Sequence, residues 1–184
     1  SKNANMKIRT ISPRAFDDVR SALTGLLLDT VAHGASVGFL ASIDADEASA
    51  YWRGVEAAVA DGSRLLLAAE INGILAGSVQ LDLCQRKNGS NRAEVQKLIV
   101  HSAARRRGIA SALMKAVEEE AIARERGVLF LDTEAGAPAE TLYRGLGYTF
   151  IGGIPEYACT PAGRWTSNAI YYKTLFAREV AGQA

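Results

Sequence analysis

The amino-acid sequence predicts an α+β fold, in which one mixed, twisted sheet of about seven strands is flanked by about four helices. Two Asn-Gly pairs lie between apolar runs, a pattern typical of antiparallel hairpins. Segments with helical periodicity separate other strand-like segments, and one strand–helix–strand order in the second half requires a parallel pair. No repeat, linker or low-complexity tract interrupts the chain, so we expect residues 1–184 to form a single domain.

The first elements follow from a weak alternation and two helix starts. Residues 6–11 alternate and predict a short strand. Ser12 is followed by proline, a common first residue of helices, and apolar residues at helical spacing come next. Asp44, with Glu47 three residues later, matches a capping box and predicts a second helix that ends before Gly62.

Three successive antiparallel strands are predicted around the two Asn-Gly pairs. Asn72-Gly73 divides the apolar segment "LLLAAEINGILAGSVQLDL" into a hairpin. Asn88-Gly89 separates the second of these strands from a third one at residues 93–100.

The second half begins with a crossover. An amphipathic helix ends at Gly127, and residues 128–132 form the next strand. Because such crossovers are right-handed and join parallel strands, residues 128–132 should lie parallel to residues 93–100. A short helix in "APAETLYRGLGY" and two strands, "YTFIGGI" and "NAIYYKTLF", complete the chain.

Composition excludes several classes of function. The 21 Lys and Arg residues balance 20 Asp and Glu, and this net charge of +1 gives no general attraction to nucleic acid or to an anionic membrane. No apolar run of about 18 residues predicts a membrane span, so we expect a cytoplasmic protein. Cys84 and Cys159 are expected to be free thiols, and no cluster has the spacing of metal ligands.

The segment "RRRGIA", residues 105–110, places three arginines at the start of a helix. A helix N-terminus carries partial positive charge and free N–H donors, so cations there are unfavourable unless an anion binds among them. We therefore consider a phosphate site, which Gly108 would leave accessible to the ligand. A solvated surface and a nucleic-acid contact are the alternatives. The segment matches neither a P-loop nor a dinucleotide-binding fingerprint.

Two blocks of sequence resemble the GCN5-related N-acetyltransferase (GNAT) superfamily. "KLIVHSAARRRGIASALM" matches the family's strand, basic glycine turn and helix, with Arg105, Gly108 and Ala110 at the defining positions. "AETLYRGLGY" resembles the family's fourth helix, in which Tyr143 takes the position of a tyrosine that acts in catalysis. The resemblance implies the GNAT fold over about residues 6–176, with acetyl-CoA as the acetyl donor.

A finer resemblance is carried by "HGASVGF", "NRAEVQKL" and "LDTEAG". These segments are similar to the tabtoxin-resistance acetyltransferases of this family, which acetylate a β-lactam amino acid. They imply antibiotic resistance as a role but do not define the acceptor, because related sequences can differ in specificity.

The resemblance also implies how coenzyme A is held. Amide groups at the start of the helix would bind its diphosphate, and the preceding strand would pair its main chain with the pantetheine arm and supply an oxyanion donor near Ile99 or Val100. The cofactor-binding residues expected on this basis are Leu98, Ile99, Val100, Arg105, Arg106, Arg107, Gly108, Ile109, Ala110 and Ser111.

Glu94 and Asp132 are the candidates for the base that deprotonates the acceptor amine. Both occur in predicted strands, where acidic residues are disfavoured, and the two strands are expected to be neighbours. Two carboxylates that share a site raise the pKa of one of them. Either residue, or a water molecule that relays the proton, fits this role. The alternative is a structural pairing with Arg92 or Lys97 or exposure at a strand end.

The resemblance makes Tyr143 the proton donor for the leaving thiolate, whereas its pattern alone also fits a core residue. His33 is either a base or a structural hydrogen-bonding residue. The aromatic residues that would either wall an acceptor pocket or serve as packing are Tyr51, Trp52, Tyr157 and Trp165.

We expect the acceptor to be the amine of a small polar molecule. Acetylation of protein or peptide N-termini and a non-catalytic acyl-CoA sensor are the rival functions, although a sensor does not need Glu94, Asp132 and Tyr143 together. Both a monomer and a homodimer are compatible with the sequence, and the charge balance argues against a nucleic-acid partner.

Overall fold

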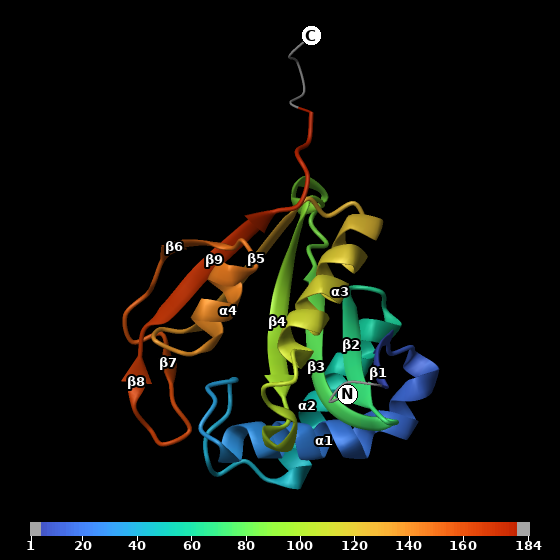
Figure 1. Ribbon diagram of the computed structural model, residues 1–184, viewed down its shortest axis with the longest axis vertical. Coiled ribbons are helices and arrows are strands. Elements are labelled where there is room, and N and C mark those ends of the chain that lie inside the picture. The colour runs from blue at the N-terminus through green and yellow to red at the C-terminus, as the bar shows by residue number, and fades with distance from the viewer. Residues whose placement is uncertain (1–4, 180–184) are drawn as a thin grey trace.

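The computed structural model describes residues 5–179 and contains one seven-stranded sheet with the strand order β1-β2-β3-β4-β5-β9-β6 (Figure 1). All neighbouring strands are antiparallel except β4 and β5, which are parallel as the crossover predicted. The strands are β1 (Met6–Thr10), β2 (Arg64–Ile71), β3 (Ile74–Leu83), β4 (Arg92–Val100), β5 (Val128–Glu134), β6 (Thr149–Gly152) and β9 (Asn168–Thr174).

Four α-helices cover the two faces of the sheet, and each face has its own apolar core. The helices are α1 (Phe16–Ala32), α2 (Ala45–Ala60), α3 (Ile109–Ala123) and α4 (Ala139–Gly145). Helices α1 and α2 enclose a core around Trp52, Leu23 and Leu66. Helices α3 and α4 enclose a second core around Leu113 and Tyr171. The predicted α+β class with seven strands and four helices is confirmed.

The predicted helix starts are close to the observed ones. Ser12 precedes a short 3-10 helix, η1 (Pro13–Ala15), and α1 begins directly after it. Asp44 caps α2, because its carboxylate accepts a 2.8 Å hydrogen bond from the amide of Glu47. Within residues 5–179, no helix has both the length and the apolar character needed to cross a membrane.

The two Asn-Gly pairs differ in what they do. Asn72 and Gly73 have φ values of 52° and 78°, so they form the left-handed turn expected between β2 and β3. Asn88 and Gly89 also connect two antiparallel strands, as predicted, but they belong to a 3-10 helix, η2 (Lys87–Gly89), and do not form a left-handed turn. Gly89 is needed there for space, since a Cβ atom would lie 2.6 Å from the sulfur of Cys84.

Two features of the second half were not predicted. Strand β9 inserts between β5 and β6, so the last strand of the sheet in sequence is not at its edge. The connection from β6 to β9 forms a separate two-stranded ribbon of β7 (Ala158–Cys159) and β8 (Trp165–Thr166). As expected, both cysteines are free thiols.

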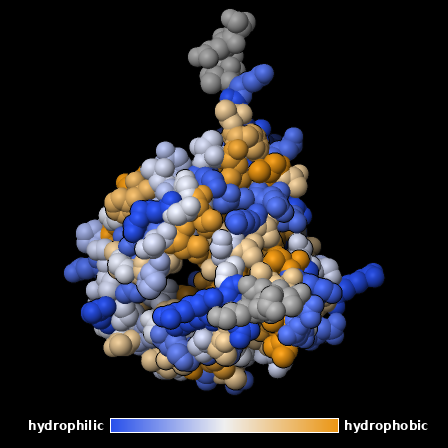
Figure 2. Space-filling model, viewed as in Figure 1, coloured by the Kyte–Doolittle hydropathy of each residue, from blue (hydrophilic) through white to orange (hydrophobic). Residues whose placement is uncertain are grey.

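Strands β4 and β5 part after a short paired section. Their register includes only Arg92 to Glu94 of β4, opposite Val128 to Phe130 of β5. Figure 1 shows the two strands meeting at one end and diverging toward the other. Figure 2 shows a recess in the surface over this region. The edge of β4 that faces β5 is therefore without a paired strand beyond Glu94.

Candidate active site

The start of α3 has the features of an anion site. Gly108 is its N-cap, with φ at 75°, and contributes no side-chain acceptor to the first turn. No acidic residue lies in that turn, while Arg105 and Arg106 are exposed beside it. A Cβ atom at Gly108 would meet no protein atom within 4 Å, so the space above this glycine is open. The first-turn amides and the arginines fit a phosphate group.

The turn before α3 is anchored to α1. Asp29, whose side chain is 13% exposed, accepts hydrogen bonds from the amide and the hydroxyl of Ser102 at 2.8 and 2.6 Å. His33 contacts the carbonyl oxygen of Asp29 at 2.8 Å, and His101 lies 3.6 Å from its carboxylate. This geometry makes His33 a structural residue rather than a base.

The open edge of β4 has the position expected of a pantetheine-binding strand. Residues Ile99 and Val100 pair only with Ser78 and Gly77 of β3, so their other side faces the gap toward β5. Gly77 of β3 allows Ile99 and Ile109 to approach it closely, because a Cβ atom there would lie 2.9 Å from the carbonyl oxygen of Ile99 and 3.2 Å from Ile109. The glycine thus brings the start of α3 close to β4.

Glu94 and Asp132 lie on the same face of the sheet. Glu94 is opposite Phe130, and Asp132 is two residues further along β5, so the alternation of strands directs both side chains to one side. Burial raises the pKa of Glu94 above its usual value, and the nearby Asp132 and Asp82 add to this rise, although a hydrogen bond from Gln96 opposes it. A carboxylate with a raised pKa is suited to accept a proton near neutral pH.

Asp132 is held in place from the neighbouring strand. Its carboxylate accepts a 3.1 Å hydrogen bond from the side-chain amide of Asn168, the first residue of β9. Asp132 is exposed, whereas Glu94 is half-buried, so the two carboxylates have different environments.

Tyr143 is the buried residue of α4 and is 6% exposed. Its ring packs against Tyr148 and Tyr171, with centroid distances of 5.9 and 6.0 Å. Burial, together with the charge of Asp132, raises the pKa of Tyr143 to about 12. The hydroxyl of Tyr143 has no hydrogen-bond partner among residues 5–179. Its proton is therefore not donated to another group of the protein.

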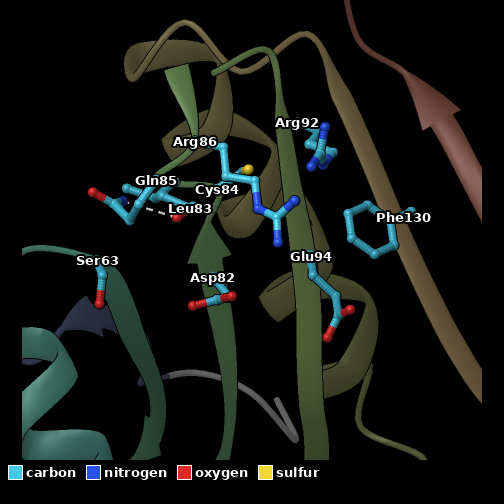
Figure 3. Close-up of a pocket in the computed structure, with 9 residues that line it drawn as sticks. All are labelled: Ser63, Asp82, Leu83, Cys84, Gln85, Arg86, Arg92, Glu94 and Phe130. Atoms are coloured by element: carbon cyan, nitrogen blue, oxygen red, sulfur yellow. Dashed lines mark hydrogen bonds between the residues drawn. The ribbon is translucent and has the colours of Figure 1, made fainter. Parts of the chain in front are cut away.

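An open cleft of about 560 Å³ borders Glu94 (Figure 3). Figure 3 shows the carboxylates of Asp82 and Glu94 directed to the same side, and Arg86 extending toward β4. The lining of the cleft therefore combines acidic and basic groups, which suits a polar ligand. Its lining residues are Ser63, Asp82, Leu83, Cys84, Gln85, Arg86, Arg92, Glu94 and Phe130.

The family model described as the acetyltransferase (GNAT) family matches residues 32–148, which is more than half of the chain. The chain belongs to the GNAT acetyltransferase family. As a GNAT enzyme it is an acetyl-CoA-dependent acetyltransferase, which confirms the enzyme class and the donor expected from the sequence.

Solved structures of other GNAT-like proteins have the same fold. The protein yncA of Salmonella typhimurium, described as an acetyltransferase and solved with its cofactor acetyl-CoA, is 20% identical with a TM-score of 0.76, and the match covers 98% of this chain and 100% of that one. A ribosomal-protein-alanine N-acetyltransferase from Brucella melitensis is 25% identical with a TM-score of 0.72, over 92% and 99% of the chains. A protein described as a phosphinothricin N-acetyltransferase is 19% identical with a TM-score of 0.75, over 94% and 100%.

Several residues of this GNAT site were not singled out from the sequence. Gln96 is two positions from Glu94 and so shares its strand face, a signal that alternation contains. Asp29 interrupts an apolar helix, but nothing local indicates its partner 73 residues away. No group of three or more metal-ligating side chains occurs in the part of the chain that the structure describes.

The aromatic residues considered for the acceptor pocket separate into two groups. Trp52 is fully buried in the core under α1 and α2, so it is packing. Tyr51 lies on the same sheet face as Glu94, because its hydroxyl accepts a 2.9 Å hydrogen bond from Gln80, which is opposite Gln96 in the sheet. Tyr157 and Trp165 are 50% and 65% exposed and lie beside the β7–β8 ribbon.

Proposed function

We propose that this GNAT enzyme transfers the acetyl group of acetyl-CoA directly to the amine of a small, polar, amino-acid-like acceptor. An antimetabolite or antibiotic that resembles tabtoxinine-β-lactam fits this description, and antibiotic resistance would be the biological role. The observation that carries the proposal is the presence of Glu94 and Asp132 on one sheet face, beside the parted strands. Acetyl-CoA is a cytoplasmic metabolite, so the reaction would occur in that compartment.

The donor would be held by two features of this chain. The uncapped amides and the arginines of residues 105–111 bind the diphosphate, and the main chain of residues 98–100 pairs with the pantetheine arm along the open edge of β4. Acetyl-CoA supplies the acetyl group as an activated thioester. Among the residues of β4, the amides near Ile99 and Val100 are the proposed oxyanion donors.

The proton chemistry is assigned to the three residues that the sequence singled out. An alkylamine is protonated at neutral pH, and Glu94 removes its proton, either directly or through water, because its raised pKa matches this task. Asp132 attracts the ammonium group and raises the pKa of Glu94. Tyr143 keeps its proton up to a pKa of about 12 and donates it to the leaving thiolate.

A small acceptor is supported by the mixture of charges in the cleft. Asp82 and Glu94 suit an ammonium group, and Arg86 and Arg92 suit an acidic group. The second candidate is acetylation of a protein N-terminus. The likeness to a ribosomal-protein-alanine N-acetyltransferase at 25% identity favours it.

The test is an assay of thiol release from acetyl-CoA with a panel of amines. The panel contains β-lactam amino acids, ordinary diamino acids, polyamines, aminoglycosides and peptides with free N-termini. Turnover with amino-acid-like acceptors, and loss of it in Glu94→Gln and Asp132→Asn variants, would support the proposal. Turnover with peptides alone would overturn it in favour of the second candidate, and no turnover with any amine would favour a sensor.

A further inference from the structure

Lys97 has an unusual position in β4. Its φ value of 50° lies in the left-handed region, which non-glycine residues rarely adopt. The register between β3 and β4 shifts at this point, between Ser78 and Gln80, so Lys97 forms a bulge in the strand. Bulges redirect side chains, and they occur frequently next to active sites.

The bulge directs the amine of Lys97 into the face of the sheet that carries the cleft. Its Nζ lies 5.7 Å from the centre of the Tyr51 ring, in α2. It also lies 3.2 Å from the position where a Cβ atom of Gly38 would be, so the loop between α1 and α2 leaves room for it. Asp132 and Glu94 are the acidic groups whose charges act on Lys97.

The amine of Lys97 has no carboxylate within 4 Å and no hydrogen-bond acceptor among residues 5–179, although the side chain is half-buried. The charged groups around it are already engaged with other partners. Arg64 pairs with Asp82 at 3.4 Å, Glu94 accepts from Gln96, and Asp132 accepts from Asn168. Burial lowers the pKa of Lys97, which reflects the cost of removing its charge from water.

A partly buried cation that has an aromatic ring beside it but no anionic partner is unfavourable unless a ligand supplies the negative charge. We propose that Lys97 binds the carboxylate of the acceptor while Glu94 and Asp132 receive its amine, so that the enzyme selects zwitterionic amino acids over plain amines. This inference rests on the proposed function and names the chemical group by which the acceptor is recognised. Tyr51 and Gly38 form the walls that hold the Lys97 side chain in place.

The experiment compares acceptors that differ only in the carboxylate. L-ornithine is matched with putrescine, and L-lysine with cadaverine, in the thiol-release assay with acetyl-CoA. We expect the wild-type protein to have the higher kcat/KM with the amino acid of each pair. In Lys97→Met the ratio of kcat/KM values within a pair should fall by about tenfold or more, through KM, because one charge-assisted interaction is lost. Lys97→Arg keeps the charge and should restore part of the preference.

Lys7→Met is the matched control, because Lys7 is exposed on β1 and lies outside the cleft. Lys97→Gln serves as a second neutral variant if the methionine variant does not fold. An equal ratio for the wild-type protein, or an equal loss for both acceptors in Lys97→Met and Lys97→Gln, would overturn the inference while leaving the proposed function intact. Turnover with peptides only would instead remove the proposed function.

Discussion

Asp29 of α1 accepts hydrogen bonds from both the main-chain amide and the side-chain hydroxyl of Ser102, which lies two residues after the end of β4. The two hydrogen bonds connect the first helix to the turn that leads into the arginines at the start of α3. A proline at the position of Ser102 would supply neither donor, because proline has no amide hydrogen and no hydroxyl. The chain therefore anchors the turn proposed to bind the diphosphate with a carboxylate that a proline could not engage.

Asp29→Ala should weaken acetyl-CoA binding and lower stability. Two partly buried donors of Ser102 lose their acceptor, which costs up to about 1–3 kcal/mol each when no water replaces it. Calorimetric titration with acetyl-CoA and urea unfolding measure the two effects. Asp18→Ala is the control, because Asp18 is exposed on the same helix. Unchanged acetyl-CoA affinity in Asp29→Ala would show that the anchor does not position the turn.

Glu94→Gln should remove the acidic limb of the pH–rate profile. Because burial and nearby carboxylates raise the pKa of Glu94 above 4.5, the group is a base only above that raised value, and kcat/KM should fall as pH drops through it. Loss of a general base costs about 10²–10⁴-fold in rate. The comparison with Asp132→Asn identifies the base, since only the variant that lacks the base loses the limb. A wild-type profile in Glu94→Gln would exclude this residue.

Tyr143→Phe should lower turnover at least about tenfold and leave acetyl-CoA affinity nearly unchanged, because it removes only a proton donor. Its pKa of about 12 means that the hydroxyl stays protonated throughout the ordinary assay range, so it adds no alkaline limb below that value. Tyr172→Phe is the control, since Tyr172 is a partly exposed residue of β9. Wild-type turnover in Tyr143→Phe would leave this residue with a packing role alone.

Gly108→Ala and Gly25→Ala should change stability in opposite directions. Gly108 has a φ of 75°, where a side chain costs about 1–2 kcal/mol, and the added methyl also enters the space proposed for the diphosphate. Gly25 lies within α1, and a Cβ atom there meets nothing within 4 Å, so alanine should stabilise the helix by about 1 kcal/mol. Thermal unfolding and acetyl-CoA titration measure both variants. Equal acetyl-CoA affinity in the two variants would contradict the diphosphate site.

The local signals in the sequence predicted most of the elements. Asn72-Gly73 forms the expected turn because its left-handed backbone depends on these two residues alone. The same dipeptide at Asn88-Gly89 forms part of a 3-10 helix instead, in a place so close to Cys84 and Arg92 that a Cβ atom on Gly89 would clash with both. Predictions from helical and strand periodicity are correct for the same reason as the prediction of the Asn72-Gly73 turn. Each depends only on residues within a few positions of one another.

The candidate site was only partly visible in the sequence. Glu94, Asp132 and the arginine turn stood out because their residue types conflict with a strand or a helix start. Lys97, with its left-handed backbone, did not stand out in the sequence, because its bulge arises from the pairing of β4 with β3.

By itself, the sequence determined the α+β class, the parallel β4–β5 pair and the family to which this chain belongs. Only the tertiary structure decided that β9 inserts between β5 and β6, that Asp29 holds Ser102, and that the amine of Lys97 lies over the ring of Tyr51. The physical reason is the range of the interactions. Periodicity and turn preferences act within one element, whereas strand order and side-chain partners depend on contacts between residues far apart in the chain.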